Sequence, residues 1–484
     1  MPLGRSACPM TSSVRVRAQS IAAGLDLAPL WAERLDRRRD EYFLNISYPP
    51  LQAMPSVRAA DIYPSDGARP NRSVAAYVHI PFCRAPCSYC HYFKTFRATE
   101  HTIDRYLDLL DLELSLHVRN LGAITVASLY VGGGTPSYLS PIQIERLFRI
   151  LHQSLVIPDR TEISFEVHPE NATAELFAIL RGTGVNRISL GVESLDDRVL
   201  AGQQRRHTAA DALRAYDLAI LSGFDNVNVD LIYGLRGQTL SSWDETLAGT
   251  ASLAPASLCA YYLRLKQGTP EYHRYLRDPA QFPSDHELLV MHIMTCEAME
   301  ALGYQQDIVD WFIREPRFFH TYQQHNWQRT DEIELLGIGA SAYSYVNGYQ
   351  YYNAVNMDDY ASRLARGELP TWRGERLADL GERMRRALVL GLKTRINRTV
   401  FRRTYGIDMV KAFPETLARL EEIGVVEVGT ADVELTYVGK LFADEVGREF
   451  YSPDMRSRMR AIEPSTISTT LPKLNVLSDG QDAG

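Results

Sequence analysis

Between residues 74 and 265, short apolar runs alternate with amphipathic helical stretches, and this alternation constrains the fold more than any other feature. Near-continuous apolar runs of this length are typical of strands buried on both faces, and their alternation with helices favours a parallel sheet covered by helices. We therefore predict an α/β fold built around a partial (β/α)6 barrel, with the functional residues at the carboxyl ends of the strands. The predicted strands are Val74–Ile80, Leu129–Val131, Ile163–Val167, Arg187–Val192, Val227–Tyr233 and Leu258–Leu265.

Capping signals support the helices between these strands. Ser140 can cap a helix that has Pro141 in its first turn and Gln143 to close a capping box. A second helix is expected to start at Thr208, with Asp211 three residues on, and to stop at Gly223.

The regions outside the barrel differ in pattern. Residues 1–73 are interpreted as an N-terminal extension with one helix near 27–41, and 74–372 as the barrel core. Residues 373–452 contain two helical stretches, 376–393 and 414–423, followed by two short strands, Val425–Val428 and Val433–Thr436. This order predicts a small α+β domain of winged-helix type. Residues 453–484 are rich in Ser, Thr, Pro and Gly, and we expect them to form a mobile tail.

Charge and cysteine content narrow the class of protein. The formal net charge is -7 and there is no long basic run, which disfavours a nucleic-acid partner. No apolar run is long enough to span a bilayer, so no membrane partner is expected. Three of the six cysteines lie within eight residues, which suits a metal site in a reducing cytoplasm better than a disulfide framework.

The cysteine loop Cys83-Arg-Ala-Pro-Cys87-Ser-Tyr-Cys90 follows the first predicted strand and carries the strongest chemical signal. Thiolates are the usual ligands of iron–sulfur clusters, and three of them leave one iron of a four-iron cluster open to a small molecule. A three-cysteine zinc site is the alternative, but His91 directly follows Cys90 and is poorly placed to complete a tetrahedron with it. The loop therefore favours a [4Fe–4S] cluster.

Polar residues at other strand ends are candidates for ligand binding. The turn Gly132-Gly133-Gly134-Thr135-Pro136 lets a ligand approach the backbone, although a tight strand–helix turn explains it equally well. Glu166 and His168 share one face of a strand. Glu166 suits ribose hydroxyls, whereas His168 is either a proton carrier or a satisfied core histidine. Near later strand ends lie three further charged residues that could together bind a zwitterion: Glu193, Arg205 and Asp230.

These motifs, in this order, resemble the oxygen-independent coproporphyrinogen III oxidase family of radical S-adenosylmethionine (SAM) enzymes. The resemblance runs from about Tyr77 to Ala342. Besides the cysteine loop and the glycine turn, it rests on the segments Tyr77-Val-His-Ile-Pro-Phe-Cys83, Asn186-Arg-Ile-Ser-Leu-Gly-Val-Glu193, Asp230-Leu-Ile-Tyr-Gly-Leu and Leu336-Gly-Ile-Gly-Ala-Ser-Ala.

The resemblance implies a cluster that cleaves SAM, two bound SAM molecules, and an electron donor such as flavodoxin or ferredoxin. Residues that would contact the cluster-bound SAM are Tyr77, Tyr89, Gly133 and Glu166. Residues that would contact the second SAM are Gly134, Thr135, Glu193, Arg205 and Asp230, with the planar fork of Arg205 suited to a carboxylate.

Three departures from the porphyrinogen-decarboxylating members bear on the reaction. Tyr92 stands where they carry a further cysteine, His168 where they have Asp, and Glu193 where Gln is usual. We therefore expect a changed substrate surface, with Tyr92 and His168 as candidate catalytic residues.

The departures favour the family's natural-product branch, which transfers a methyl or methylene carbon from SAM to an sp2 carbon, in some cases with a partner methyltransferase. Coproporphyrinogen decarboxylation and haem chaperoning are the alternatives. The chaperones typically lack a long N-terminal segment such as the one that ends Tyr42-Phe-Leu-Asn-Ile-Ser-Tyr-Pro-Pro.

Overall fold

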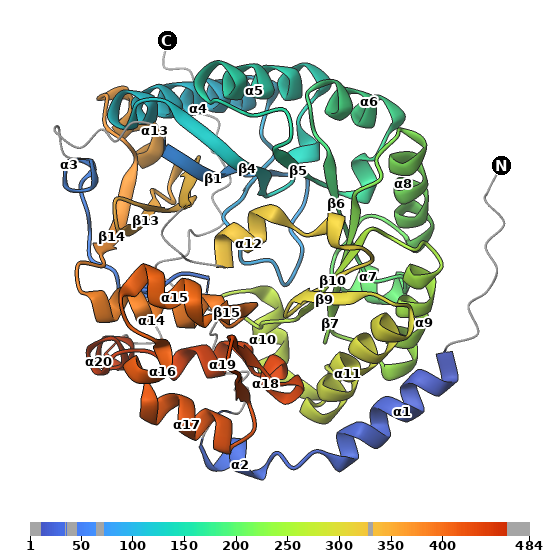
Figure 1. Ribbon diagram of the computed structural model, residues 1–484. Helices are drawn as coiled ribbons and strands as arrows, with labels where there is room; N and C mark the ends of the chain where they lie inside the picture. Colours follow the sequence, from blue (N-terminus) through green and yellow to red (C-terminus); the bar gives the residue numbers. More distant parts are fainter. Residues whose placement is uncertain (1–10, 34, 36–45, 64–71, 328–332, 462–484) are drawn as a thin grey trace.

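The computed structural model describes residues 11–33, 35, 46–63, 72–327 and 333–461. Six parallel strands form its centre and confirm the predicted α/β barrel. They are β1 (Arg72–Ile80), β4 (Ile124–Gly133), β5 (Glu162–Val167), β6 (Arg187–Glu193), β7 (Val227–Tyr233) and β8 (Ser257–Tyr262). Each contains or overlaps a predicted strand. Figure 1 shows them as the inner wall of a ring with helices outside.

The six parallel strands do not close into a full barrel. β1 and β8, at the two edges, pair with further strands and not with each other. β1 pairs with β11 (Glu334–Ile338), which leads through β12 (Tyr343–Val346) and β13 (Tyr349–Asn353) to β14 (Thr371–Arg376). β8 pairs with β10 (Trp311–Ile313), which leads to β9 (Gln305–Ile308). The whole is one sheet of twelve strands. Short elements near the barrel mouth are β2 (Phe82–Cys83) and β3 (Thr95–Phe96).

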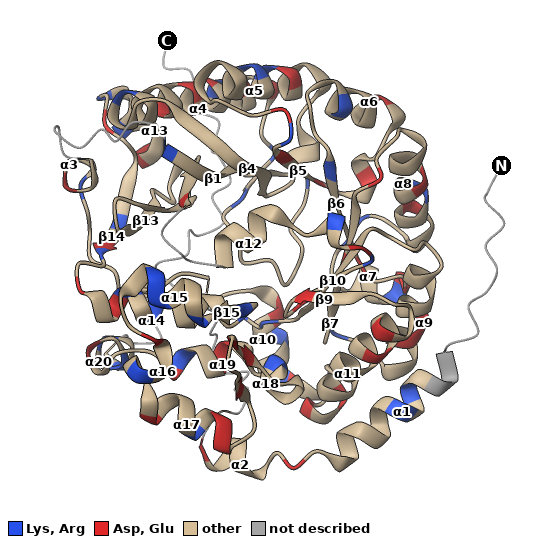
Figure 2. Cartoon of the chain, in the orientation of Figure 1, with Lys and Arg blue, Asp and Glu red and all other residues tan. Residues whose placement is uncertain are grey.

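Helices cover the outer face of the barrel because their apolar sides pack on the strands. They are α4 (Glu100–Leu121), α5 (Pro141–Ser154), α6 (Ala174–Gly182), α7 (Asp197–Gly202), α8 (Ala209–Leu221), α9 (Leu240–Ala251), α10 (Pro270–Arg277) and α11 (Asp285–Ala301). The capping boxes predicted at Ser140 and Thr208 are both present. Two more helices follow, α12 (Thr321–Trp327), which lies in the middle of the ring in Figure 1, and α13 (Met357–Ala365). Basic and acidic residues are interspersed along the outer helices in Figure 2.

The N-terminal extension contains a helix that the sequence did not reveal. α1 (Thr11–Gly24) packs beside α11, where Arg17 Nε lies 2.6 Å from Glu297 Oε2. Its apolar residues do not form a clear stripe, so periodicity could not identify it. Of the helix expected near 27–41, α2 (Ala28–Ala32) is present, and 34 and 36–41 lie outside the described residues. α3 (Ala59–Ile62) ends the extension.

The C-terminal region is an α+β unit whose apolar core also includes residues of the N-terminal extension and the barrel, such as Leu30, Tyr48 and Trp311. Its sheet has the order β15 (Arg395–Asn397), β17 (Asp432–Leu435), β16 (Val426–Val428). Its helices are α14 (Leu380–Gly391), α15 (Arg398–Tyr405), α16 (Met409–Ala412), α17 (Pro414–Glu422), α18 (Tyr437–Leu441) and α19 (Ala443–Arg448). The predicted boundary at 372/373 falls inside β14, because that strand pairs with β13 of the main sheet.

The start of the expected mobile tail is ordered instead. Residues 453–460 form α20 (Pro453–Arg460), which Ser452 caps and whose Met455 is buried. Arg458 holds this helix to Glu375 of β14 at 2.9 Å. The rest of the predicted tail, 462–484, lies outside the described residues. Within the described part of the chain, no helix is both long and apolar enough to cross a membrane.

Candidate active site

A cavity of about 430 Å³ opens at the carboxyl ends of the barrel strands. Every residue that the sequence singled out as a candidate lines it: Tyr77, Cys83, Cys87, Tyr89, Cys90, Tyr92, Gly133, Gly134, Thr135, Glu166, His168, Glu193, Arg205 and Asp230. These residues come from six strands, β1, β2, β4, β5, β6 and β7, and from segments that follow β2, β4, β5 and β6. The parallel topology brings them together because every strand carries its loop to the same end of the barrel.

The three cysteines face one another across this cavity. Cys83 ends β2 and is buried, whereas Cys87 and Cys90 lie in the loop that follows and are partly exposed. Thr135 Oγ1 donates to Cys83 Sγ at 3.4 Å, and Arg205 Nη1 donates to Cys87 Sγ at 3.5 Å. Donors to sulfur are a common feature of iron–sulfur sites, so the donor set fits a cluster.

A single-metal site fits less well. Among the described residues, no three His, Cys, Asp or Glu side chains are arranged to hold one metal ion. His91, the ligand considered for zinc, stacks on Tyr92 with ring centroids 4.6 Å apart. In the metal-free chain, burial raises the pKa of the Cys83 and Cys87 thiols, so cluster binding must displace their protons.

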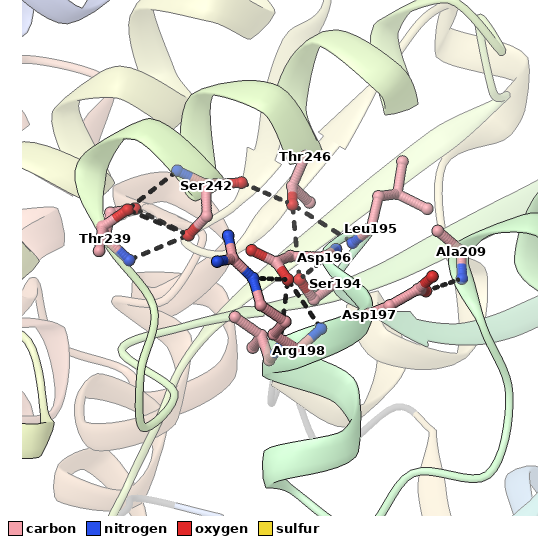
Figure 3. A network of polar contacts seen from close by, with 10 residues as sticks. Ser194, Leu195, Asp196, Asp197, Arg198, Ala209, Thr239, Ser242 and Thr246 are labelled. Atoms are coloured by element: carbon pink, nitrogen blue, oxygen red, sulfur yellow. Dashed lines mark hydrogen bonds and ion pairs between the residues drawn. The ribbon is translucent and has the colours of Figure 1, made fainter.

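The cysteine loop is held from outside the barrel. Ser88 Oγ donates to Gln203 Oε1 at 3.0 Å, Ser88 N donates to Gln203 O at 3.1 Å, and Glu271 N donates to Ser88 O at 3.2 Å. Gln203 follows α7, whose start is fixed by Ser194, Asp196 and Thr246 in the network of Figure 3. One rigid segment therefore positions both the cysteine loop and Arg205.

The glycine turn brings backbones close together rather than presenting free amides. A Cβ on Gly134 would lie 2.9 Å from Ile80 O, and one on Gly132 would lie 2.8 Å from Glu166 Oε1. The Gly134 and Thr135 amides donate to Ile80 O and Phe82 O, and the Gly133 amide donates to Glu166 Oε2 at 3.2 Å. These hydrogen bonds fit the tight strand–helix turn that the sequence left open as an alternative.

Glu166 occupies the centre of the predicted first SAM site. Its carboxylate accepts from Tyr130 Oη at 2.8 Å as well as from the Gly133 amide. Burial outweighs these two donors and raises the pKa of Glu166 to about 7. Beside it, Tyr77 and Tyr130 stack with ring centroids 6.1 Å apart.

The residues predicted for the second SAM form an adjoining charged group. Arg205 Nη2 lies 3.6 Å from Glu193 Oε1 and also donates to Gly191 O. Asp230 accepts from Ser189 Oγ at 2.7 Å and from Asn228 Nδ2 at 2.8 Å. Burial raises the pKa of Glu193 to about 6 and also raises that of Asp230. Glu193 reaches this position from a bulge between β6 and β7, where its φ is 65°.

His168 lines the cavity, but its surroundings do not favour the predicted role of proton acceptor. Its Nδ1 accepts from the Glu170 amide at 3.2 Å, which leaves Nε2 as the N–H of a neutral ring. Burial, with Arg205 next, holds the pKa of His168 far below its usual value. Its ring also meets that of His207 edge-on at 5.1 Å. In this tautomer the Nε2–H of His168 is a hydrogen-bond donor.

Tyr92, the other candidate catalytic residue, is 56% exposed at the mouth of the cavity. Lys94 Nζ donates to the carbonyls of Cys90 and Tyr92, at 2.7 and 3.1 Å, which fixes this end of the loop. The catalytic role of Tyr92 stays a prediction.

The sequence interpretation missed two groups. Arg187 is a charge inside a buried strand beneath the cavity, and the reasoning that singled out Asp230 could have found it. The C-terminal domain contributes the other group: Lys393, Lys440 and Asp444 line the cavity together with Arg264 of the barrel. No local pattern distinguishes these residues, because only the docking of the domain places them there.

Comparison with known proteins agrees with this geometry. The sequence model of the radical SAM superfamily matches residues 77–248. Heme chaperone HemW of Mycobacterium tuberculosis H37Rv is 30% identical over 386 residues, which cover 78% of this chain and 95% of that protein. Oxygen-independent coproporphyrinogen III oxidase of Escherichia coli K12 is 29% identical over 387 residues, covering 77% and 84%.

The chain belongs to the oxygen-independent coproporphyrinogen III oxidase and HemW family of the radical SAM superfamily. The solved structure of the E. coli oxidase, described as a radical SAM enzyme, superposes with a TM-score of 0.70 at 28% identity, covering 79% of this chain and 91% of that one. As a member, the protein is a radical SAM enzyme that uses a [4Fe–4S] cluster and SAM. Cys83, Cys87 and Cys90 are the residues suited to hold the cluster.

Proposed function

We propose that this radical SAM enzyme binds two SAM molecules and transfers a methyl-derived carbon from one of them to an sp2 carbon of a planar natural-product intermediate. The product would be methylated or cyclopropanated. The proposal rests on how the cations of the cavity are already paired. Five of the seven Arg and Lys residues that line it form ion pairs with carboxylates of the protein.

The pairing is tightest where the C-terminal domain meets the barrel. Asp444 lies 2.9 Å from Arg264 Nη2 and 2.8 Å from Lys393 Nζ, and Glu445 lies 3.1 Å from Arg264 Nη1. A substrate rich in carboxylates, such as coproporphyrinogen III, would have to compete with these internal carboxylates for the cations. A substrate with little charge would leave the pairs intact.

The remaining wall is aromatic. Eight tyrosines line the cavity: Tyr77, Tyr89, Tyr92, Tyr130, Tyr261, Tyr262, Tyr322 and Tyr343. Tyr130 meets Tyr77 and Tyr322 at centroid distances of 6.1 and 5.2 Å. Such surfaces bury planar conjugated molecules with offset or edge-on packing. This wall supports an aromatic or alkenic substrate.

When bound, the cluster and SAM supply the radical that starts the reaction, as the family resemblance implies. The residues of this chain position the reactants. Glu166 and Tyr130 would hold the ribose of the cluster-bound SAM, and Arg205, Glu193 and Asp230 the charged groups of the second. The C-terminal domain covers the mouth and restricts water, so that the transferred carbon meets one substrate atom. The electron would come from a donor such as flavodoxin or ferredoxin.

Coproporphyrinogen decarboxylation is the second candidate, and the names of the relatives favour it, together with haem binding, over carbon transfer. Its specific support is the extent of the match, which covers 91% of the solved E. coli oxidase. Identity is nearly the same to the oxidases and to the chaperones, 29% and 30%, so similarity alone does not choose between them.

One labelling experiment separates the three activities. The anaerobically reconstituted protein is reduced with SAM that carries a trideuterated methyl group, with and without coproporphyrinogen III, and products are analysed by mass spectrometry. Carbon transfer predicts deuterium in 5′-deoxyadenosine, because hydrogen leaves the second SAM's methyl group. Decarboxylation predicts unlabelled 5′-deoxyadenosine and loss of CO2 from the porphyrinogen. A haem absorption band after haem addition, without either product, would assign the chaperone role. The Cys87→Ala variant is the matched control.

A further inference from the structure

Arg187 is a buried charge that the proposed mechanism does not yet use. It begins β6 and is 0% exposed. None of its three guanidinium nitrogens has a hydrogen-bond partner among the described residues. An isolated charge in a protein interior is costly, so a guanidinium is kept there only if other groups compensate for it.

The guanidinium lies in the barrel interior, below the cavity. Arg187 shares the inward face of β6 with Ser189, Gly191 and Glu193, which line the cavity above it. Its charge acts on side chains from three other elements, namely Tyr130 of β4, Asp230 of β7 and Cys259 of β8, and on His320, which precedes α12. We call this buried interior below the cavity the barrel floor.

A polar network connects this floor to Asp230. Ser257 Oγ donates to Asn228 Oδ1 at 2.9 Å, and Asn228 Nδ2 donates to Ser189 Oγ at 3.0 Å and to Asp230 Oδ1 at 2.8 Å. Ser189 Oγ donates to Asp230 Oδ2 at 2.7 Å. Both Asp230 oxygens therefore accept hydrogen bonds from below, which is the arrangement that an ionised carboxylate prefers.

Asp230 needs this support because it shares one cavity with two other acids. Burial and the neighbouring carboxylates of Glu166 and Glu193 all favour the protonated form of Asp230. Arg205 favours the ionised form of Asp230, but it already interacts with Glu193 and Cys87. Arg187 is the stronger of the two cations acting on Asp230. Groups from other elements that also interact with Asp230 are Tyr92, Tyr130, Cys259 and Tyr261.

Glu162, Asp307 and Asp310 are other carboxylates near this floor, and Glu162 already has hydrogen-bond donors from the backbone. Its oxygens accept from the Thr321 and Tyr322 amides at 3.1 and 3.2 Å, and His320 Nε2 lies 3.8 Å away. Arg187 is therefore available to act on Asp230.

We propose that Arg187 is a positioning residue, the buried counter-ion that keeps Asp230 ionised so that Asp230 can accept hydrogen bonds from the second SAM. The part that concerns SAM rests on the proposed function, whereas the charge state of Asp230 can be measured independently of it. Arg187 touches neither the cofactor nor the reacting atoms.

The first measurement is the infrared difference spectrum of cluster-loaded wild-type protein against Asp230→Asn at pH 7. An ionised Asp230 contributes carboxylate bands and no protonated carbonyl band. In Arg187→Gln the protonated band should appear, and in Arg187→Lys, which retains a charge, it should stay absent. A protonated Asp230 in the wild-type protein overturns the proposal, and so does an ionised Asp230 in Arg187→Gln. If Arg187→Gln fails to fold, Arg187→Met is the second neutral variant and must show the same protonated band.

The second measurement is equilibrium SAM binding between pH 6 and pH 9. Arg187→Gln should bind the second SAM on the order of tenfold more weakly at pH 6.5 and approach wild-type affinity at pH 9, where Asp230 ionises without help. A merely structural role would weaken binding equally at all pH values. If the wild-type protein binds a single SAM, the two-SAM proposal fails, and the infrared result alone judges Arg187.

Discussion

The Tyr130 hydroxyl donates a 2.8 Å hydrogen bond to Oε1 of Glu166, across the two neighbouring strands β4 and β5. This bond and the Gly133 amide lower the pKa of Glu166, yet burial prevails and the pKa rises to about 7. Glu166 is therefore balanced between its two charge states near neutral pH. The site keeps a carboxylate that costs folding energy, as functional sites commonly do.

We expect Glu166→Gln to stabilise the SAM-free protein at high pH. The folded state binds the Glu166 proton more tightly than the unfolded state, so ionised Glu166 destabilises the fold above about pH 7. The penalty, on the order of 3 kcal/mol, grows as the pH rises from about 4.5 to 7 and disappears below 4.5, where both states are protonated. The unfolding temperature of the variant should be raised at pH 8 and unchanged near pH 4. An equal gain at both pH values would contradict the raised pKa.

We expect Tyr130→Phe to weaken the binding of the cluster-bound SAM. The variant loses a donor that favours the ionised form, so the pKa of Glu166 should rise further. Binding of the cluster-bound SAM should then weaken more at pH 6.5 than at pH 8.5, as measured by equilibrium dialysis. Tyr262→Phe, at a tyrosine of the same cavity outside the predicted SAM sites, serves as the control and should show no such pH dependence.

Cys87→Ala should abolish SAM cleavage, because the remaining two thiols cannot hold a cluster with one open iron. Reconstituted variant protein should contain far less than the roughly four irons expected of the wild type. Cys296→Ala is the matched control, since Cys296 lies on α11 and does not line the cavity. Wild-type amounts of 5′-deoxyadenosine from Cys87→Ala would refute the cluster assignment.

Asp230→Ala should retain the cluster and the first SAM but lose the second. Removing one partner of a buried charged contact costs about 2–5 kcal/mol of binding. Reductive formation of 5′-deoxyadenosine should persist while its deuterium from labelled SAM disappears. Asp111→Ala, at an exposed position of α4, is the control. Deuterium transfer at the wild-type rate in Asp230→Ala would place the second SAM elsewhere.

Asp444→Asn tests whether internal ion pairs exclude carboxylate-rich substrates. The change removes the carboxylate that Arg264 and Lys393 share without altering side-chain volume, although Glu445 still pairs with Arg264. Affinity for coproporphyrinogen III should increase, by about tenfold if each of the two cations gains about 0.7 kcal/mol from a propionate. Calorimetric titration with coproporphyrinogen III measures the effect. Asp408→Asn is the control variant, because its partner Arg398 does not line the cavity. Unchanged affinity would remove the main support for a weakly charged substrate.

Local pattern was sufficient for the barrel and for most of the site. The strands and the helix starts at Ser140 and Thr208 follow from residue periodicity and capping, which act within a few positions of the chain. Once the strands are parallel, Glu166, Glu193 and Asp230 must lie at one end of the barrel. The cysteine spacing likewise carries its chemistry within eight residues.

What only the tertiary structure decided depends on contacts between distant segments. α1 has no clear apolar stripe and is helical against α11, and α20 is ordered because Arg458 reaches Glu375. The sequence left His168 as either a proton carrier or a satisfied core histidine, and only the structure shows that its Nδ1 accepts from the Glu170 amide. The sequence determined which ionisable groups enter the barrel. Their charge states depend on burial and on neighbours such as Arg187 and Asp444, because electrostatic free energies are set by distance and solvent access in the folded chain.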